Sequence, residues 1–248
     1  MRLLKVLIHQ IINHYKICQL TLGQCDLCQS QIIKQPLLCE HCWADLPRCE
    51  YPIKGGNLLH WPAVNQLFVH RSFDQLFCFA PYIWPVDHWL KQFKYHNRFE
   101  LALLLSSLLE SLWYQHIVPL LDNDYLLTVV PIHPKKWQQR GYNQAHLMAK
   151  NLQHKVNARY NDKLLIRKEF TASQVGQSGN QRRKNLQHAF AIHPHLSNLP
   201  EQVIILDDVI TTGSTVNAVS QLLRQQGVKT IIVLTLALSL PEVTPPKR

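Results

Sequence analysis

The sequence VIILDDVITTGST runs from Val203 to Thr215. Its apolar first part ends in two adjacent carboxylates, Asp207 and Asp208, and a short loop of hydroxyl residues around Gly213 follows. From Val216 to Gln226 the apolar residues recur at helical spacing, and the glycine that comes next is a typical helix stop. The pattern predicts a buried strand, a loop at its carboxyl end and a helix.

This strand, loop and helix are suited to a phosphorylated sugar. A loop that opens a helix offers free backbone N–H groups at the positive end of the helix dipole. Gly213 lets the backbone approach an anion, and the loop hydroxyls add hydrogen-bond donors. The hydroxyl residues are Thr211, Thr212, Ser214 and Thr215. Asp207 and Asp208 can accept hydrogen bonds from the vicinal hydroxyls of a ribose. We therefore expect a site for a sugar 5-phosphate.

A second interpretation treats the same residues as turn chemistry between a buried strand and a capped helix. The order of the elements favours binding, because strands in α/β sheets point their carboxyl ends at ligands. The segment also closely resembles the phosphoribosyl-pyrophosphate (PRPP) signature of type I phosphoribosyltransferases, which is a long and specific motif.

Length and composition fit one large domain with a small one. The chain has 248 residues, 46% of them hydrophobic, and a formal net charge of +10. Such a charge favours anionic partners such as phosphates, nucleic acid or a membrane surface, although it also serves solubility. Polar residues interrupt the apolar residues of segment 1–24, so we expect a packed N-terminal helix, with a membrane-surface helix as the alternative. The apolar run Leu101–Leu109 is too short to span a bilayer. We expect no transmembrane segment and a cytoplasmic protein.

Four of the seven cysteines form two Cys-x-x-Cys knuckles. These are Cys25, Cys28, Cys39 and Cys42. Two knuckles can present four thiolates to one tetrahedral Zn²⁺, and the metal would supply much of the folding energy of the small segment 25–50. A disulfide pair and a redox Cys-x-x-Cys are the alternatives, which a cytoplasmic setting and the doubled motif disfavour. Cys18 and Cys78 lie among apolar residues and are expected in the core; Cys49 has no matched partner.

Between the cysteine segment and the stretch Val203–Thr215, a second predicted strand is followed by a segment rich in hydrogen-bond donors. Residues 51–72 carry prolines and a glycine pair and are expected to be a linker. A strand over Phe73–Ile83 and helices over Asp87–Arg98 and Phe99–Tyr114 are predicted next. The strand Leu126–Pro131 then enters a basic loop before a helix that begins near Asn143. Its Lys135, Lys136 and Arg140 suit a pyrophosphate, or are ordinary solvated charges.

The last third alternates short strands with polar segments. Strands are predicted at Leu164–Arg167, near Ala189–Phe190 and over Ile231–Leu238. The polar stretch Lys168–Lys184 is either a lid that closes over an anion or an inert solvated loop. Residues 241–248 form a tail. The whole pattern predicts an α/β fold: a mainly parallel sheet with flanking helices over 73–240, beside a small N-terminal zinc-ribbon-like module.

Several motifs follow one another along the chain: the two knuckles, KQFKY from Lys91, PIHP from Pro131, RGYNQ from Arg140, Gln177 with Arg182, Arg183, Asn185, Ala189 and Phe190, and the stretch from Asp207 to Thr215. This order resembles the ComF family, which comprises phosphoribosyltransferase-like proteins linked to DNA uptake in natural transformation, together with the similar GntX proteins. The resemblance covers the chain from about Cys25 to Leu238. A further Cys-x-x-Cys pair, frequent in the family, is missing after Cys49, which favours a single zinc.

The resemblance implies a role for each group. Asp207 and Asp208 hold the ribose hydroxyls, the segment Thr211–Thr215 holds the 5-phosphate, and Lys135, Lys136 and Arg140 face the pyrophosphate. Three functions remain open: Mg²⁺-dependent transfer of ribose 5-phosphate from PRPP to an unknown acceptor; a DNA-uptake accessory; and a non-catalytic, zinc-stabilised nucleotide-binding regulator. The accessory binds single-stranded DNA, a DNA-uptake helicase or a recombination mediator at the inner face of the cytoplasmic membrane. Trp137 or Tyr142 then serve as base-stacking platforms. In the alternative, the basic residues serve only the pyrophosphate and these aromatic side chains pack in the core.

Overall fold

The computed structural model describes residues 23–32, 37–51, 56–168, 189–196 and 198–239. The chain divides into two compact units, Met1–Pro47 and Arg48–Arg248. Apart from their edges, the expected N-terminal helix, the polar stretch from Lys168 to Lys184 and the C-terminal tail lie outside the described residues.

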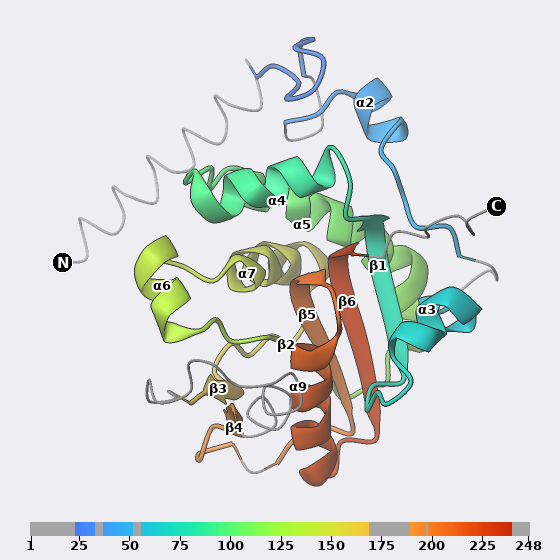
Figure 1. The fold of residues 1–248 in the computed structure, drawn as a ribbon, viewed down its shortest axis with the longest axis vertical. Coiled ribbons are helices and arrows are strands. Elements are labelled where there is room, and N and C mark those ends of the chain that lie inside the picture. The colour runs from blue at the N-terminus through green and yellow to red at the C-terminus, as the bar shows by residue number, and fades with distance from the viewer. Residues whose placement is uncertain (1–22, 33–36, 52–55, 169–188, 197, 240–248) are drawn as a thin grey trace, which may run out of the picture. The chain divides into compact units, whose positions relative to one another are not determined.

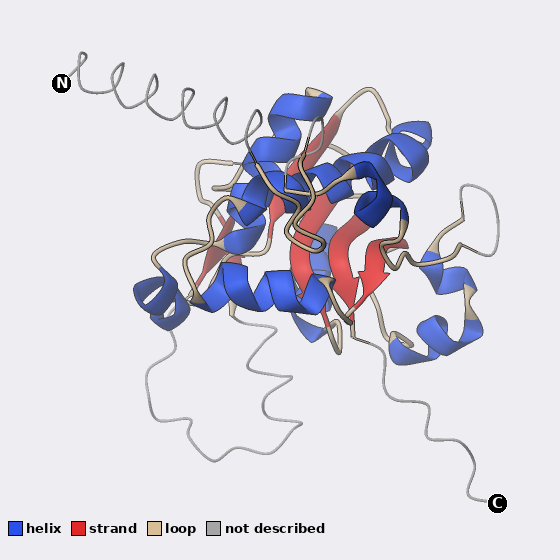
Figure 2. Ribbon diagram, turned by 90° about the horizontal axis from the view of Figure 1, so that it is seen from above, coloured by secondary structure: helices blue, strands red, loops and turns tan. Residues whose placement is uncertain are grey.

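The larger unit is built on a four-stranded sheet in which all strands run parallel. Its order is β1 (Gln75–Pro81), β6 (Thr230–Leu238), β5 (Gln202–Ile210) and β2 (Tyr125–Val129). The strands are nearly continuous apolar runs, because helices cover both faces of the sheet (Figure 2). Because the strands are parallel, their carboxyl ends meet at one edge.

Helices on both sides bury the sheet. The helix α9 (Ser214–Gln225) lies along β5 on the face turned toward the viewer in Figure 1, with Val216, Val219 and Leu223 buried. The helices α5 (Leu101–Leu112) and α7 (Gln144–Val156) pack against the strands and against each other. The helix α4 (Val86–Tyr95) packs on α5 and β6. The short strands β3 (Leu165–Arg167) and β4 (Phe190–Ile192) form a separate antiparallel pair.

The structure differs from the sequence prediction in the segment 51–72. Instead of a linker, this segment holds a 3₁₀ turn η1 (Leu58–His60) and the helix α3 (Pro62–Leu67). Leu58, Val64 and Phe68 are buried in the core beside β1 and α9. The sequence prediction missed α3 because the helix is only six residues long, which is too short for an apolar period to be recognised beside the prolines and glycines of this segment.

The helix at Leu101 also continues further than its sequence indicated. A π turn η2 (Trp113–Ile117) and a 3₁₀ turn η3 (Val118–Leu120) extend it, so the helical run Leu101–Leu120 has 20 residues and is long enough to cross a membrane. However, 67% of its most apolar window is buried inside the fold. This helix packs as a core helix does, against α7, β1 and β6.

Asn57 anchors the segment before α3 to the first strand. Its side chain is 8% exposed, its Oδ1 accepts from the N–H groups of Leu59 (2.8 Å) and Leu76 (3.2 Å), and its Nδ2 donates to the Asp74 carbonyl (3.1 Å). Buried polar groups that lose their partners are costly.

We predict that Asn57→Ala lowers the free energy of unfolding by about 2–3 kcal/mol, because it leaves buried backbone groups of β1 and η1 unpaired. Chemical denaturation measures the change. The control is Asn65→Ala, since Asn65 bonds Arg71 at an exposed position and its loss should cost under about 0.5 kcal/mol. Equal losses in the two variants would contradict this account.

Candidate functional site

A cavity of about 360 Å³ lies at the carboxyl edge of the sheet. Residues that follow all four strands line it: Tyr82 after β1, Ser239 after β6, Thr211 after β5 and Val130 after β2. Ligands of open parallel sheets bind at this edge. The cavity is therefore the natural place to look for the groups that the sequence singled out.

Both carboxylates of the acidic pair line this cavity. The sequence predicted that the two carboxylates end the strand. In the structure β5 continues past them to Ile210, so Asp207 and Asp208 lie inside the strand, near its carboxyl end. Burial, and next the charge of Asp208, raise the pKa of Asp207 to about 8; the backbone N–H of Asp208 and the charge of Lys94 oppose this shift. Two adjacent carboxylates in a partly buried place thus carry a strong tendency to take up a proton or a cation.

The loop after β5 separates two cavities. Thr211 and Thr215 line the first cavity, and Thr211, Thr212, Gly213 and Ser214 line a second one of about 770 Å³. Gly213 has a φ of +67°, and a Cβ placed on it would lie 2.5 Å from the Phe68 ring. Only glycine therefore fits between Phe68 and the N-terminus of α9. The Thr212 and Ser214 hydroxyls lie 2.9 Å apart, and the free N–H groups of α9 begin there.

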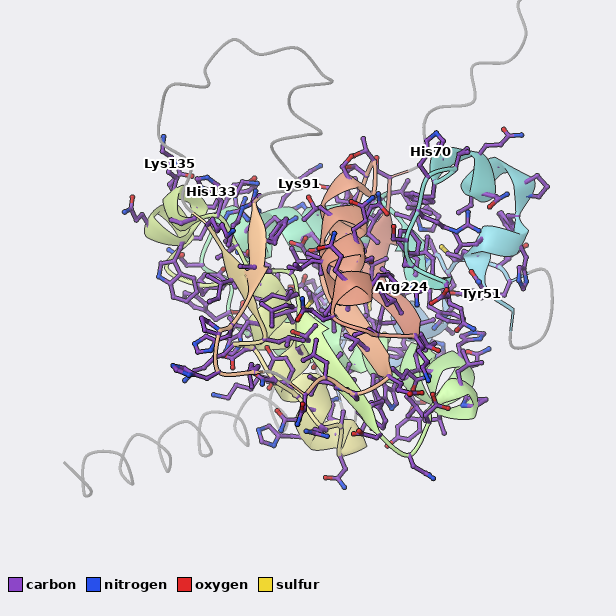
Figure 3. The ribbon with its side chains drawn as sticks, turned by 90° about the horizontal axis from the view of Figure 1, so that it is seen from below. Tyr51, His70, Lys91, His133, Lys135 and Arg224 are labelled. Carbon is purple, nitrogen blue, oxygen red and sulfur yellow. The ribbon has the colours of Figure 1, made fainter. Side chains whose placement is uncertain are left out.

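The basic segment after β2 is a helix rather than the predicted loop. This helix, α6 (Pro134–Arg140), starts with His133 as its N-cap and ends at Gly141, whose φ is +74°. Lys136 and Arg140 line the first cavity, but Lys135 does not. Figure 3 shows Lys135 beside His133 at one end of this edge, with His70 at the far end. Proline at the first helical position and glycine after the last explain the short helix.

The motif RGYNQ positions Arg140 at the cavity. The Arg140 guanidinium lies 4.9 Å from the centre of the Tyr95 ring, donates to the Tyr95 hydroxyl (3.0 Å), and donates to Gln144 Oε1 (3.3 Å). The side chain of Asn143 caps α7 and donates to the Val130 carbonyl. Gln144 is 2% exposed and lines the cavity, and its Nε2 has no partner among the described residues. A buried amide donor of this kind is available to an oxygen-rich ligand.

The two aromatic residues considered as stacking platforms have different environments. Trp137 is 50% exposed on α6. Tyr142 is buried, packs on Phe93 and Phe99, and donates its hydroxyl to the Phe93 carbonyl. Tyr142 is therefore a core residue that joins α4 to the start of α7, as the alternative of core packing predicted, and it is not placed to stack on bases.

Two further basic groups reach the acidic pair. Lys94, in the last turn of α4, pairs with Asp208 at 2.7 Å, and Arg167, at the end of β3, lines the same cavity. Burial lowers the pKa of Arg167, while the charge of Asp207 opposes this. Lys94 was named from the sequence only as part of a family motif and was given no role in the site. Its position in the KQFKY motif was the only signal, because helical spacing alone does not tell which lysine faces the sheet edge.

The smaller unit brings the four predicted cysteines together. The Sγ atoms of Cys25, Cys28, Cys39 and Cys42 all lie within 4.8 Å of one another, and those of Cys28 and Cys39 are 3.6 Å apart. Around a tetrahedral Zn²⁺ with Zn–S bonds of about 2.3 Å, the sulfurs are about 3.8 Å apart. A turn closed by Cys25 N to Ser30 O (2.7 Å) forms the first knuckle, and Cys39 caps the helix α2 (Glu40–Ala44) that carries the second. The four residues thus fit one tetrahedral metal ion.

Burial and the neighbouring thiols raise the pKa of Cys42, whereas hydrogen bonds from Ser30 lower the pKa of Cys28 to about 6. Crowded thiols of this kind ionise together only beside a cation. His41 is exposed between the knuckle cysteines, Cys78 is buried as predicted, and Cys18 lies outside the described residues.

Comparison with known proteins identifies the larger unit. A model of the phosphoribosyl transferase domain matches residues 148–247, which include the acidic pair and the loop after it. Competence protein F of Haemophilus influenzae is 34% identical over 87% of this chain and 90% of its own length. The DNA utilization protein YhgH of Salmonella typhimurium is 30% identical over 88% of this chain and 91% of its own. Competence protein ComFC of Streptococcus pneumoniae is 29% identical over 46% of this chain and 48% of its own.

The first two relatives match most of the chain, and the domain match covers the strand and loop that line the cavity. The chain belongs to the ComF family and carries a phosphoribosyltransferase domain.

Proposed function

We propose that this protein binds PRPP together with Mg²⁺ at the carboxyl edge of its sheet, and that it acts in DNA uptake or the use of external DNA. One observation carries the first part. The acidic pair, the hydroxyls of Thr211 and Thr215, and the cations Lys136 and Arg140 line a single cavity, although they come from two different strand ends. PRPP carries a matching set of groups, namely ribose hydroxyls, a 5-phosphate and a diphosphate.

The charge around the cavity supports an anionic ligand. The cavity is lined by two carboxylates and by four basic side chains that carry a permanent charge, which are those of Lys94, Lys136, Arg140 and Arg167. In the proposed complex the acidic pair accepts hydrogen bonds from the ribose, and the loop at the N-terminus of α9 binds the 5-phosphate. Lys136 and Arg140 face the diphosphate, with Lys135 at its outer side. Mg²⁺ bound with the ligand would supply additional positive charge to the diphosphate oxygens.

The same arrangement can support group transfer. The bond between ribose C1 and the diphosphate oxygen breaks, the diphosphate leaves with the electron pair, and an acceptor nucleophile forms the new bond at C1. The basic side chains stabilise the charge that develops on the leaving diphosphate. The second candidate is a nucleotide-binding regulator without chemistry. Release of pyrophosphate in the presence of nucleobases or amines distinguishes the two.

We predict that Asp207→Asn and Asp208→Asn each weaken PRPP binding about 10- to 100-fold, because each removes a charged hydrogen-bond acceptor worth about 1.5–3 kcal/mol. Isothermal titration in Mg²⁺ measures the affinity. Asp124→Asn is the control, since Asp124 forms an exposed ion pair with Arg159 just before β2, at the opposite edge of the sheet. Wild-type affinity in both site variants would disprove the ribose assignment.

The pH dependence tests the same carboxylates. Burial, and next the charge of Asp208, raise the pKa of Asp207 to about 8, which favours its protonated form at neutral pH. Binding of Mg²⁺ and ribose hydroxyls favours the ionised form, so a proton leaves on binding and the affinity should rise with pH until about 8. Asp207→Asn should flatten this rise. An affinity that falls over this range in the wild type contradicts the assignment.

We propose in addition that Cys25, Cys28, Cys39 and Cys42 hold one structural Zn²⁺. The spacing of the four sulfurs supports this site. The unit has few buried apolar residues among those described, including Ile32, Leu38 and Leu46, so a metal would supply much of its stability.

We predict that purified protein contains about one equivalent of zinc and that Cys39→Ser loses most of it, because a structural site needs all four ligands. Elemental analysis measures the content. Cys49→Ser is the matched control, since Cys49 belongs to the larger unit and should leave the zinc unchanged. A wild-type content below about half an equivalent, unaffected by Cys39→Ser, would overturn this site.

The role in DNA handling rests on the names of the relatives and on the exposed face of α6. This short helix presents Lys135, Lys136 and Trp137 to solvent beside the PRPP cavity. Basic side chains next to an exposed aromatic ring can bind a single strand through its phosphates and one stacked base.

We predict that short single-stranded DNA binds here with an affinity that falls steeply with salt, and that PRPP competes with it because both ligands use the same cations. Lys135→Glu and Trp137→Ala should each weaken binding about tenfold in a filter-binding assay. Lys229→Glu is the control, because Lys229 pairs with Glu201 near the amino end of β6. DNA affinity that ignores salt, PRPP and both α6 variants would place any DNA contact on another surface.

A further inference from the structure

Three consecutive residues at the end of α4 each contact a different part of the site. The Phe93 carbonyl accepts the Tyr142 hydroxyl, the Lys94 ammonium pairs with Asp208, and the Tyr95 hydroxyl accepts from Arg140. Lys94 thus reaches the strand that carries the acidic pair, and Tyr95 holds the cation at the end of α6. This single turn connects the two segments that the proposed function assigns to ribose and diphosphate.

Lys94 differs from the other lysine of the same helix face. Lys91, one turn earlier, has a side chain that is 54% exposed and pairs with Asp87 within the helix at 2.6 Å. The Lys94 side chain is only 15% exposed, lines the cavity, and pairs across the fold with Asp208, which is 16% exposed. Burying an ammonium is costly unless its environment compensates for the lost water. One carboxylate satisfies only part of a group with three donors.

The position of Lys94 also addresses an electrostatic difficulty of the site. A diphosphate bound beside Asp207 and Asp208 is repelled by both carboxylates. Lys136 and Arg140 approach the cavity from the β2 side, whereas Lys94 is already in contact with Asp208. An ammonium placed between the acidic pair and the diphosphate reduces this repulsion and keeps a donor for the ligand.

We propose that Lys94 is a ligand-binding residue whose ammonium is shared between Asp208 and the diphosphate of the phosphoribosyl ligand. This inference rests on the proposed function. It gives Lys94 a direct contact with the ligand, in addition to the orientation of Asp208 for the ribose.

The two roles separate in their response to inorganic pyrophosphate, which has no ribose. If Lys94 only orients Asp208, its loss weakens PRPP but leaves pyrophosphate binding unchanged. If Lys94 also contacts the diphosphate, its loss weakens both ligands. Removing the charge of Asp208 instead releases Lys94 and removes a repelling carboxylate, so pyrophosphate should bind more tightly while PRPP binds more weakly.

The experiment is isothermal titration of PRPP and of pyrophosphate, each in Mg²⁺, with the wild type, Lys94→Met, Lys94→Arg and Asp208→Asn. The control is Lys91→Met, which removes an ammonium from the same helix outside the cavity. We expect Lys94→Met to weaken pyrophosphate about 10- to 100-fold, Lys94→Arg to recover part of the loss, and Lys91→Met to match the wild type. The double variant Lys94→Met with Asp208→Asn leaves no unpaired charge, which covers the case in which Lys94→Met folds poorly.

Each outcome decides one point. The proposed contact is overturned if Lys94→Met binds pyrophosphate as tightly as the wild type does, or if the double variant binds it as tightly as Asp208→Asn does. Either result leaves the proposal of PRPP binding untouched. Absence of PRPP and pyrophosphate binding in the wild type instead refutes the proposed function itself. A pyrophosphate loss of the same size in Lys91→Met would show that only the overall charge matters, which also overturns the inference.

Discussion

Two adjacent carboxylates on a buried parallel strand set the main constraint on this molecule. Asp207 and Asp208 lie in β5, within a sheet that is covered on both faces, and the Asp208 side chain is only 16% exposed, so water solvates the pair incompletely. Repulsion between the two groups and loss of hydration together favour neighbouring cations. The surrounding elements supply such cations from three directions, with Lys94 on α4, Arg140 on α6 and Arg167 on β3.

The parallel order of the strands makes this convergence a consequence of the fold. In the order β1, β6, β5 and β2 every strand ends at the same edge, so segments distant in the chain meet there. The RGYNQ motif is then a structural connector as much as a binding element. Its tyrosine packs under α4, its asparagine caps α7, and its arginine and glutamine turn to the cavity. The proposed diphosphate site thus depends on core packing a few residues away.

The N-terminal unit follows a different rule, since the part of it that is described has few apolar side chains to bury. Its geometry is set by two turns that point four sulfurs at one centre. The metal that we propose at this centre would contribute much of the order of so small a unit. The proposed zinc and PRPP sites therefore involve separate sets of residues, one in each of the two compact units.

Local patterns in the sequence determined much of the larger unit. The apolar runs at β5 and β6 and the helical spacing of α9 are strong periodic signals, and the comparisons confirm the phosphoribosyltransferase domain that the stretch from Asp207 to Thr215 predicted. The paired spacing of the cysteines likewise predicted a cluster that the structure brings together. Each of these signals lies within one short segment, where the period of burial is fixed by the backbone itself.

Only the tertiary structure decided which side chains of different segments meet. The helix α3 is too short for its period to be recognised, and the contact of Phe68 with Gly213 fixes its place in the fold. The helix α6 is similarly short, and its bounding Pro134 and Gly141 are local signals, but only the fold shows that it brings Arg140 to the cavity. Lys91 and Lys94 share one pattern in the sequence, yet one is solvated and the other is paired with Asp208. The difference arises from the packing of α4 on β6, which is a contact between residues far apart in the chain, and no local spacing records it.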